Sequence, residues 1–472
     1  MRPGAIFVAV SGVKEDGHAY AQQAVARGAV AVVGNKAEGV PGLGAPYIQV
    51  RDPRRAAGLI AHALAGDPTR DMTVLGITGT NGKSSTAYLT QSILQHASLH
   101  SDWSGKIKGT ANFGTMGYFI NGTPHPAPHT TPFGEDLARL FQQAKEEGVS
   151  HAVMEVSSHA LEQERVAGIH FQAGAFTNLT QDHLDFHEDM DAYKRAKLRL
   201  FERIEGDNRF TVVNVNDPAA PAFLAASKVR CYTFGKGGDY KASKIEVDIS
   251  GTRFELKTPS GRAQVHFRLL GKHNVMNALC AAALCGGLGL PIELIASGLA
   301  ALPRVPGRFE AVDAGQNFFV IVDYAHTEDG LLNVLQAARK ICKNRLITLF
   351  GCGGDRDKGK RAKMAAVAAR YSDYSIITSD NPRTEDPHRI LLDVEVGMQH
   401  AGKRKDDDYL VIENRADAIR TAIDMARAGD FVMIAGKGHE DYQILGTERI
   451  HFDDREVARG VLEARRGVQK RP

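Results

Sequence analysis

A glycine-rich segment at residues 76–85, Gly-Ile-Thr-Gly-Thr-Asn-Gly-Lys-Ser-Ser, constrains the fold more than any other part of this sequence. The apolar residues 73–77 predict a buried strand before it, and residues 84–96 predict a helix after it. Gly79 and Gly82 allow a tight bend in which successive N–H groups point at phosphate oxygens, and the positive end of the helix faces the same anion. The segment therefore predicts a phosphate-binding loop in an α/β fold.

Two side chains of this loop carry the predicted chemistry. Lys83 is placed to reach the outer phosphates of a nucleotide, and Ser84 is placed to bind Mg²⁺. The pattern is incomplete, because Ile77 stands six residues before Lys83 where a glycine is expected. A glycine turn without a ligand stays open as the alternative, but the order of strand, turn, Lys-Ser pair and helix favours binding of ATP or GTP.

Length and composition limit the class of protein. The chain has 472 residues, and at ~150 residues per domain it is expected to form about three domains. Its 43% apolar and 24% charged residues are typical of a globular protein. The net charge is only +3 and no basic block alternates with aromatic residues, so nucleic acid is not an expected partner.

The five cysteines and the N-terminus predict a cellular compartment. The cysteine number is odd and no Cys-x-x-Cys spacing occurs, which indicates neither a zinc site nor a disulfide framework and fits a reducing cytosol. The first residues lack the apolar core and cleavage site of a signal peptide, and no run of about 18 apolar residues follows anywhere. We therefore expect a cytoplasmic protein without a membrane partner.

The pattern of apolar runs divides the chain into residues 1–72, 73–306 and 307–472. The first segment predicts strands at 5–10 and 29–33 around a helix at 19–27, and the second predicts a parallel sheet with crossover helices. Alternating residues at 241–270 predict antiparallel hairpins attached to the second segment. Two prolines and a glycine at 303–307 predict a hinge, and strands at 318–322, 346–350, 374–378, 409–412 and 431–434 predict a third, doubly wound domain.

Polar segments follow several of these strands, at the edge where ligands bind in open α/β sheets. Glu155 ends a strand and either holds Mg²⁺ or caps the next helix. His183 and His187 have the spacing of a zinc pair on a helix, but no third ligand is evident, so a nucleotide-metal role for His183 is preferred over zinc, with a solvated helix start left open. By its segment alone Lys197 is expected to be a surface lysine.

Two further polar segments lie in the third domain. Residues 353–360 form a charged turn that suits either a solvated loop or a binding site. In the run from Asp380 to Arg383, Pro382 stiffens the turn and Arg383 offers a bidentate fork to a carboxylate. A simple Asx-Pro turn is the competing interpretation.

Taken together, these motifs resemble the Mur ligases in residue type, order and spacing. The resemblance rests on residues 79–84 (Gly-Thr-Asn-Gly-Lys-Ser), 154–159 (Met-Glu-Val-Ser-Ser-His), 177–185 and 273–278. Residues 323–326, 351–361, 380–383 and 435–440 resemble the members that add diaminopimelate. The resemblance extends from about residue 3 to 458 and implies a domain for the UDP end of the substrate, a central P-loop ATPase domain and a C-terminal Rossmann-like domain for the amino acid.

The resemblance also implies a reaction in peptidoglycan precursor synthesis. ATP would phosphorylate the D-glutamyl carboxylate of UDP-N-acetylmuramoyl-L-alanyl-D-glutamate, and an amine of meso-diaminopimelate would attack the acyl phosphate. An amide, ADP and phosphate would result, and the enzyme is expected to act as a monomer. Such chemistry depends on positioning and charge neutralisation, because a carboxylate at neutral pH is a poor electrophile.

Site residues follow from the same resemblance. The phosphates would be held by Gly79, Thr80, Asn81, Gly82, Lys83, Ser84 and Ser85. Mg²⁺ would be bound by Ser84, Glu155 and His183, adenine by Asn274 or Asn277, and Arg308 and Asp323 would complete the nucleotide site. Lys197 stands where the family has a carbamylated lysine that binds a second Mg²⁺.

The two other substrates have implied contacts as well. The peptide would meet Thr130, Thr131, Ser157, Gln163 and Arg165. Diaminopimelate would meet Arg356, Asp380, Asn381, Pro382, Arg383, Gly436 and Glu440. Relatives that add lysine differ at the position of Arg383, so the arginine implies a substrate end with a carboxylate.

The sequence departs from the family pattern at three places. The family has a further N-terminal segment with a Ser-Arg pair near the uridine, and this sequence starts after the place where that pair would lie. We therefore expect either an upstream start or different uridine contacts. His129 replaces an asparagine, and Thr327-Glu328 replaces Thr-Pro. A folylpolyglutamate synthase-like ligase, disfavoured by residues 380–383, and a nucleotide-binding relative without catalysis stay open as alternatives.

Overall fold

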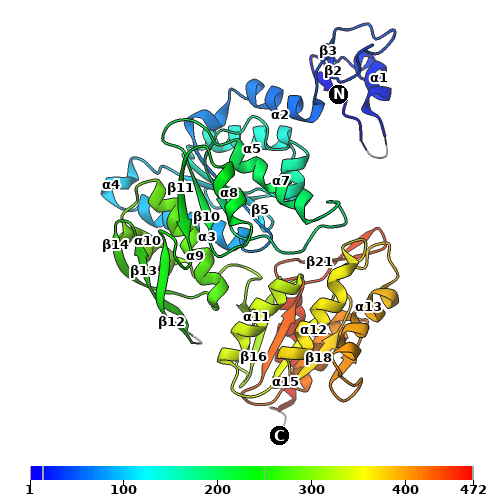
Figure 1. The fold of residues 1–472 in the computed structure, drawn as a ribbon. Helices are drawn as coiled ribbons and strands as arrows, with labels where there is room; N and C mark the ends of the chain where they lie inside the picture. The colour runs from blue at the N-terminus through cyan, green and yellow to red at the C-terminus, as the bar shows by residue number, and fades with distance from the viewer. Residues whose placement is uncertain (1, 13–14, 249, 470–472) are drawn as a thin grey trace.

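The computed structural model describes residues 2–12, 15–248 and 250–469, and each of the three predicted segments contains a sheet of its own (Figure 1). The N-terminal unit, drawn in dark blue, stands at one end, and the orange and red C-terminal unit at the other. No helix in the described ranges combines the length and the apolar composition needed to cross a membrane.

The N-terminal sheet has three parallel strands, β1 (Ile6–Val8), β2 (Ala31–Gly34) and β3 (Tyr47–Gln49). Helix α1 (Ala21–Ala26) follows a 3₁₀ turn (Gly17–Tyr20), close to the predicted helix. The sequence analysis missed β3 and helix α2 (Pro53–Leu64). Asp52 caps α2 by accepting from the N–H of Arg55 at 3.1 Å, and Pro53 opens it.

The central sheet has eight strands among the described residues. Their order is β11 (Arg230–Phe234), β10 (Phe210–Asn214), β9 (Phe171–Phe176), β4 (Thr73–Thr78), β8 (His151–Glu155), β5 (Thr110–Gly114), β6 (Gly117–Ile120) and β7 (Thr123–His125). The first six are parallel, whereas β6 pairs antiparallel with β5 and with β7. The predicted parallel sheet is present, and the sequence analysis missed its antiparallel edge, where two-residue connections are too short for a crossover helix.

Helices cover both faces of the central sheet. One face packs against α3 (Lys83–Ser98), α9 (Lys272–Gly287) and α10 (Ile292–Ala301). The other packs against α5 (Gly134–Glu146), α6 (Ser158–Glu162), α7 (Met190–Glu202) and α8 (Ala220–Ala226), and the short helix α4 (Ser101–Ser104) follows α3. The predicted hairpins are present as β12 (Lys241–Asp248), β13 (Gly251–Thr258) and β14 (Gly261–Phe267), whose apolar residues join the α10 side of the core.

The C-terminal sheet is doubly wound, as predicted. Its order is β15 (Glu310–Ala311), β16 (Phe319–Asp323), β20 (Phe431–Ala435), β17 (Leu346–Phe350), β18 (Tyr374–Ile377) and β19 (Tyr409–Val411), with only β15 antiparallel. Helices α11 (Glu328–Ile341), α12 (Arg361–Tyr371) and α13 (Pro387–His400) cover one face, and α14 (Arg415–Asp424) and α15 (Asp454–Gln469) the other. The hairpin of β21 (Tyr442–Leu445) and β22 (Glu448–His451) was not predicted.

Strand register brings the polar segments of each domain to one edge. In the central sheet Ile77 pairs with Glu155 and Thr78 with Phe176, so β4, β8 and β9 end side by side. In the C-terminal sheet Asp323 pairs with Ala435, and β17 and β18 end together in the same way. The loops that follow these strands meet across the domain boundary.

Candidate active site

The phosphate loop has a backbone that only glycine accommodates at two positions. Gly79 has φ +148° and Gly82 has φ +84°, and a Cβ would collide with the hydroxyl of Thr177 at the first and with the amide of Asn277 at the second. Asn178 at the end of β9 accepts from the N–H groups of residues 80 and 81 at 2.8 and 2.9 Å. The loop is therefore held in shape by its neighbours, and α3 starts at Lys83, one residue before the predicted start.

Two buried lysines converge on this loop. Lys83 Nζ donates to the carbonyls of Gly79 and Thr80 at 2.9 and 2.8 Å, and Lys197 Nζ donates to the same Gly79 carbonyl at 2.8 Å. Lys197 is 1% exposed, so the surface position predicted from its segment alone is wrong. Burial lowers the pKa of Lys83, and burial together with the nearby charge of Lys83 lowers the pKa of Lys197 well below its usual value.

Lys197 has an environment that favours the neutral amine. Its Nζ lies 4.3 Å from the centre of the Tyr193 ring, and no carboxylate within the described ranges comes within 4.0 Å of it. A neutral amine is the form that reacts with CO₂, so the surroundings of this lysine suit a carbamate.

Glu155 lies at the carboxyl end of β8 and is 2% exposed. Its carboxylate accepts from the N–H of Thr115 at 2.9 Å and from the Thr115 hydroxyl at 3.1 Å. Helix α6 is capped by Ser157, which accepts from the N–H of Ala160 at 3.2 Å, so the helix-cap interpretation of Glu155 is wrong.

His183 lies in a turn rather than on a helix. Its φ is +56°, and residues 184–187 form a turn and a bend, so the interpretation as a helical zinc pair or a helix start is wrong. His187 instead contacts the Ser158 hydroxyl at 2.9 Å. Burial lowers the pKa of His183 to about 3, which leaves the imidazole neutral near pH 7 and able to bind a cation.

The donor set fits Mg²⁺ rather than zinc. In the part of the chain that the structure describes, no group of three or more His, Cys, Asp or Glu side chains forms a metal cage. Mg²⁺ is usually bound through one or two carboxylates and completes its shell with substrate phosphates, other oxygen or nitrogen ligands and water. Glu155, Ser84 and His183 are the residues that would hold it.

Arg308 reaches the nucleotide loop from beyond the hinge. Its Nη2 donates to the Ser84 hydroxyl at 3.4 Å, its guanidinium lies 4.6 Å from the Tyr324 ring centre, and its buried Nε has no hydrogen-bond partner in the described residues. Asp323 accepts from the N–H groups of Phe309 and Ala325 at 2.7 and 2.8 Å, and burial raises the pKa of this carboxyl. A cation with an unused donor therefore faces the phosphate loop.

Asn274 and Asn277 lie at the start of α9, beside the phosphate loop. Asn277 Nδ2 donates to Asn274 Oδ1 at 3.0 Å, and Asn274 Nδ2 donates to the carbonyl of Leu270 at 2.9 Å. Their predicted role in binding adenine stays a prediction.

Four of the predicted peptide contacts form one cluster beside Glu155. Thr131 Oγ1 donates to the Glu155 carbonyl at 2.9 Å and accepts from the N–H of Ser157 at 3.1 Å. Arg165 donates to the Thr131 carbonyl at 2.9 Å and to Gln163 Oε1 at 3.0 and 2.7 Å. The fifth residue, Thr130, accepts from the Thr115 hydroxyl at 3.1 Å.

The predicted amino-acid contacts gather at the carboxyl edge of the C-terminal sheet. Asn381 Nδ2 donates to Glu440 Oε2 at 3.0 Å, and a Cβ on Gly436 would lie 2.7 Å from Asp380 Oδ2. Arg383 has φ +54° and donates through Nη1 to the carbonyl of residue 354 at 2.8 Å, while the Pro382 carbonyl packs against the same loop.

Arg356 lies beside this cluster, since a Cβ on Gly353 would lie 3.0 Å from Arg383 Nη1 and 3.9 Å from Arg356 Cγ. It is half-exposed and lies 3.8 Å from Asp185 of the central domain.

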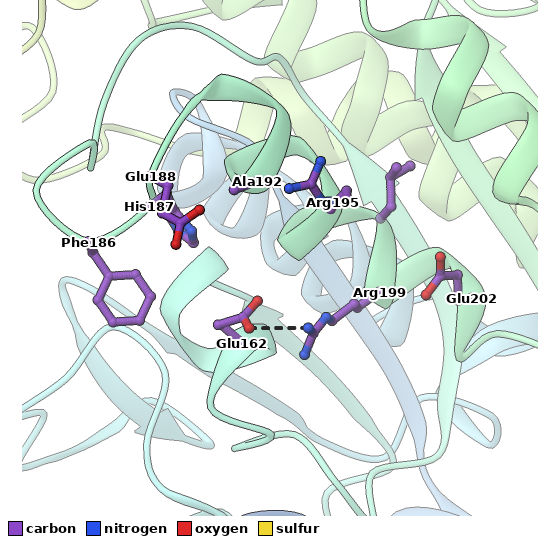
Figure 2. Close-up of a pocket in the computed structure, with 9 residues that line it drawn as sticks. Glu162, Phe186, His187, Glu188, Ala192, Arg195, Arg199 and Glu202 are labelled. Carbon is purple, nitrogen blue, oxygen red and sulfur yellow. Dashed lines mark hydrogen bonds and ion pairs between the residues drawn. The ribbon is translucent and has the colours of Figure 1, made fainter. Parts of the chain in front are cut away.

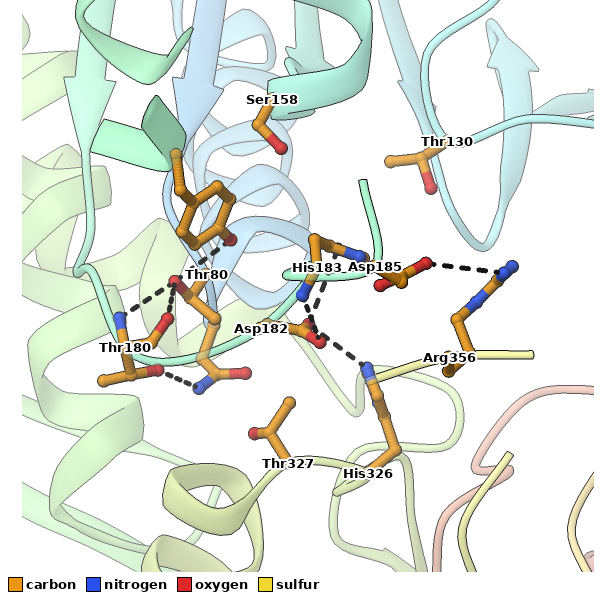
Figure 3. A network of polar contacts seen from close by, with 12 residues as sticks. Thr80, Thr130, Ser158, Thr180, Asp182, His183, Asp185, His326, Thr327 and Arg356 are labelled. Atoms are coloured by element: carbon orange, nitrogen blue, oxygen red, sulfur yellow. Dashed lines mark hydrogen bonds and ion pairs between the residues drawn. The ribbon is translucent and has the colours of Figure 1, made fainter. Parts of the chain in front are cut away.

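A network of charges that the sequence analysis missed crosses between the domains (Figure 3). Asp182 is 6% exposed, and its carboxylate lies 3.6 Å from Lys360 Nζ, 3.9 Å from His326 Nε2 and 3.5 Å from His183 Nε2. Asp182 and Lys360 lie within the motifs at 177–185 and 351–361, but no role was predicted for either, because sequence position does not reveal burial.

A surface hollow of about 490 Å³ lies on the outer side of α6 and α7 (Figure 2). Glu162 and Arg199 pair there at 3.1 Å. None of the predicted site residues lines this hollow, and Lys197 is on the buried face of α7, so the hollow is separate from the candidate active site.

Comparisons with known proteins bear on all three segments. The sequence matches the profiles described as Mur ligase family, catalytic domain, over residues 1–64, Mur ligase middle domain over residues 77–285, and Mur ligase, glutamate ligase domain, over residues 307–438.

Curated relatives match over almost the whole chain. UDP-N-acetylmuramoyl-L-alanyl-D-glutamate--2,6-diaminopimelate ligase of Syntrophomonas wolfei is 43% identical, with 98% of this chain and 93% of the relative covered. The enzymes of the same name from Geobacillus thermodenitrificans and Solibacter usitatus are 45% and 46% identical, again over 98% of this chain, with 93% and 91% of the relatives covered.

Solved structures agree in fold. A structure of UDP-N-acetylmuramoyl-L-alanyl-D-glutamate--2,6-diaminopimelate ligase superposes with a TM-score of 0.68 at 32% identity and covers 99% of this chain and 93% of its own. Folylpolyglutamate synthase of Mycobacterium tuberculosis, complexed with ADP and AMPPCP, has a TM-score of 0.66 at 18% identity, covering 89% of this chain and 99% of its own, which concerns the fold alone. The predicted three-domain α/β fold and the predicted resemblance are confirmed, and the chain belongs to the Mur ligase family.

Proposed function

We propose that this chain is an ATP-dependent ligase that joins meso-2,6-diaminopimelate to UDP-N-acetylmuramoyl-L-alanyl-D-glutamate. The main support is that the phosphate loop with Lys83 and the cluster around Arg383 lie at sheet edges that face each other across one domain boundary. A phosphorylated carboxylate and an attacking amine can meet only where such sites adjoin.

In the first step an oxygen of the D-glutamyl carboxylate attacks the γ-phosphorus of ATP, and the bond to the bridging oxygen of ADP breaks. Lys83, Arg308 and the loop N–H groups of residues 79–85 neutralise the charge that develops on the phosphoryl oxygens. When bound by Ser84, Glu155 and His183, Mg²⁺ supplies further positive charge there.

In the second step the amine of diaminopimelate forms a bond to the activated carbonyl carbon. The tetrahedral intermediate expels phosphate, the nitrogen loses a proton, and an amide results. Thr131, Ser157, Gln163 and Arg165 hold the peptide, and Asp380, Asn381, Arg383 and Glu440 hold the diamino acid. Arg383 supplies the cation for its distal carboxylate.

Three finer proposals accompany this function. Lys197 is carbamylated and then serves as an anionic ligand for a second Mg²⁺. The domain boundaries lie at residues 72/73 and 306/307. The enzyme works in the cytoplasm as a monomer. Light scattering of the purified protein tests the monomeric state.

The decisive experiment is phosphate release measured with all combinations of substrates. Release is expected only when ATP, the UDP-linked dipeptide and diaminopimelate are all present, with one amide formed per phosphate. Release with a folate and glutamate in place of the dipeptide and diaminopimelate would favour the folylpolyglutamate-type alternative. Nucleotide binding without release under any combination would favour the non-catalytic one.

A further inference from the structure

A buried lysine outside the set of predicted site residues lies inside the amino-acid cluster. Lys437 lies two residues after the end of β20, and its side chain is 0% exposed. Its Nζ donates to Glu440 Oε2 at 3.0 Å and to Asn381 Oδ1 at 3.2 Å, and lies 5.3 Å from the centre of the Tyr442 ring. Burying an ammonium group costs free energy unless fixed partners compensate its charge. Both hydrogen-bond partners of Lys437 are predicted substrate contacts.

The first consequence concerns the orientation of Asn381. Its Oδ1 accepts from Lys437 and from the N–H of Ile444 at 3.0 Å, while its Nδ2 donates to Glu440 at 3.0 Å. Because an ammonium only donates, the amide oxygen must face Lys437 and the NH₂ group must face Glu440. One cation thus fixes the direction of both side chains.

The second consequence concerns charge. Asp380, which is buried, and Glu440, whose side chain is 15% exposed, follow β18 and β20 at the same edge of the sheet. Burial acts to raise the pKa of both, and the charge of Lys437 acts in the opposite direction on both. The charge of Asp380 also acts to raise the pKa of Glu440, so without Lys437 this carboxylate would take up a proton more readily.

We propose that Lys437 is a positioning residue for the amino-acid site. It keeps Asn381 in one orientation and Asp380 and Glu440 charged, so that an ammonium group of the incoming diamino acid meets preformed acceptors. The lysine acts through these residues and does not touch the substrate. This inference rests on the proposed function, because it deepens the account of the same site.

The test is Lys437→Met, which removes the charge and keeps most of the side-chain volume. The KM for diaminopimelate is expected to rise at least ~10-fold, as for the loss of one charged hydrogen bond, while the KM values for ATP and the UDP-linked dipeptide change less than about twofold. Lys437→Arg keeps the cation and is expected to restore part of the affinity. Lys405→Met is the matched control, because Lys405 pairs with Glu395 at 3.1 Å in the same domain but outside the site.

A second comparison separates positioning from general stability. In a Glu440→Gln background, Lys437→Met is expected to raise the KM for diaminopimelate by a smaller factor than in the wild type, because part of the effect of the lysine passes through Glu440. Equal rises in KM for all three substrates, or fully additive effects, would overturn the proposal. If Lys437→Met does not fold, calorimetric binding of diaminopimelate to Lys437→Arg and Lys437→Gln decides, and wild-type affinity in both would overturn it.

Failure of the proposed function gives a different result. If the wild-type enzyme joins another amino acid, the assignment of diaminopimelate is wrong, and the same split between KM values is measured with that amino acid. If the wild-type protein binds no amino acid in the calorimeter, both proposals fall.

Discussion

At the scale of single residues, burial decides what the charged side chains of the site can do. Lys83 and Lys197 share the carbonyl of Gly79 as a hydrogen-bond acceptor, and neither forms an ion pair with a carboxylate in the described residues. Because desolvation disfavours the charged form, both lysines give up their protons more easily than exposed ones. Burial affects the pKa of both lysines in the same direction, but their expected roles differ, because only Lys83 lies on the phosphate loop.

Lys83→Ala is expected to lower kcat by at least ~10²-fold, the scale for removing one preorganised contact to the transition state. The fold should persist, because Lys83 contacts only backbone carbonyls of its own loop. Steady-state kinetics measure kcat, and circular dichroism of the same preparation checks that the variant is folded. Near-normal turnover by a folded variant would contradict the role of the phosphate loop.

Lys197 is expected to carry a carbamate near neutral pH and to lose it in acid, because the modification needs the neutral amine. Carbon-13 NMR after exchange with labelled bicarbonate would reveal the adduct. Lys194→Arg is a suitable control, since Lys194 lies on the same helix as Lys197, is partly exposed and pairs with Asp191 at 2.7 Å. An unmodified ammonium in an active enzyme with Mg²⁺ would count against the carbamate.

Arg383 is expected to set the choice of amino acid. Diaminopimelate has a second carboxylate beside its distal amine, and lysine would leave the guanidinium unpaired, a loss on the order of 3 to 5 kcal/mol or roughly 10²-fold or more. Arg383→Asn removes the cation and keeps a residue that tolerates the left-handed backbone at φ +54°.

The measurement is kcat/KM for diaminopimelate and for lysine in the wild type and in Arg383→Asn. The variant should lose far more activity toward diaminopimelate than toward lysine. A wild-type preference for lysine, or equal losses for both, would show that Arg383 does not bind the distal carboxylate.

At the scale of elements, helix α2 joins the first segment to the central domain. It packs against α5 so closely that a Cβ on Gly134 would lie 2.8 Å from Cα of Gly58. His62 on α2 is 0% exposed, and neither ring nitrogen has a hydrogen-bond partner in the described residues. The packing of this helix therefore includes one polar ring with unsatisfied groups.

His62→Leu is expected to leave stability at pH 7 unchanged or raise it by about 1 kcal/mol, because unsatisfied polar atoms are removed. Burial lowers the pKa of His62 from 6.5 to about 4. Between these values the unfolded chain binds the proton and the folded one does not, so wild-type stability falls as the pH drops from 6.5 to about 4.

The contribution of this histidine is on the order of 3 kcal/mol over that interval. Other buried histidines titrate as well, so the quantity to measure is the difference in unfolding free energy between wild type and His62→Leu at several pH values. The difference should grow in favour of the variant on acidification. Parallel curves would contradict the assignment.

At the scale of the whole molecule, a few contacts hold the central and C-terminal domains together around the site. Burial lowers the pKa of His183 to about 3 and that of His326 to about 4, so both rings are neutral near pH 7. Lys360 is then the only full positive charge within 4.0 Å of the Asp182 carboxylate in the described part of the chain. This pair joins the two domains at the point where their loops meet.

Lys360→Met is expected to favour arrangements in which the domains move apart, because it leaves Asp182 buried without a cation, a penalty on the order of 3 kcal/mol. Small-angle scattering should give a larger radius of gyration than for wild type, and nucleotide affinity of the central domain should change little. Lys363→Met is the control, since Lys363 is exposed and contacts only the neutral Gln181 across the same boundary. An unchanged radius would show that the pair does not hold the closed arrangement.

The local pattern was sufficient for most of the fold. Buried parallel strands such as β17 and β20 consist of continuous apolar runs, and Gly79 and Gly82 mark a bend that few other residues allow, so these elements and the phosphate loop were predicted close to their observed positions. The edge strands β6 and β7 and the hairpin of β21 and β22 were missed, because half-exposed strands lack such runs.

Order along the chain also predicted which polar segments lie at one sheet edge, because they follow parallel strands, and the resemblance to the Mur ligases supplied the expected roles of single residues. Tertiary structure alone decided which of them are buried and which meet. Lys197, Asp182, Lys360 and Lys437 read as ordinary charged residues, and their chemistry depends on desolvation and on partners more than 50 positions away. Burial and long-range contact are properties of the packed chain, because they arise only when separate strands and domains come together.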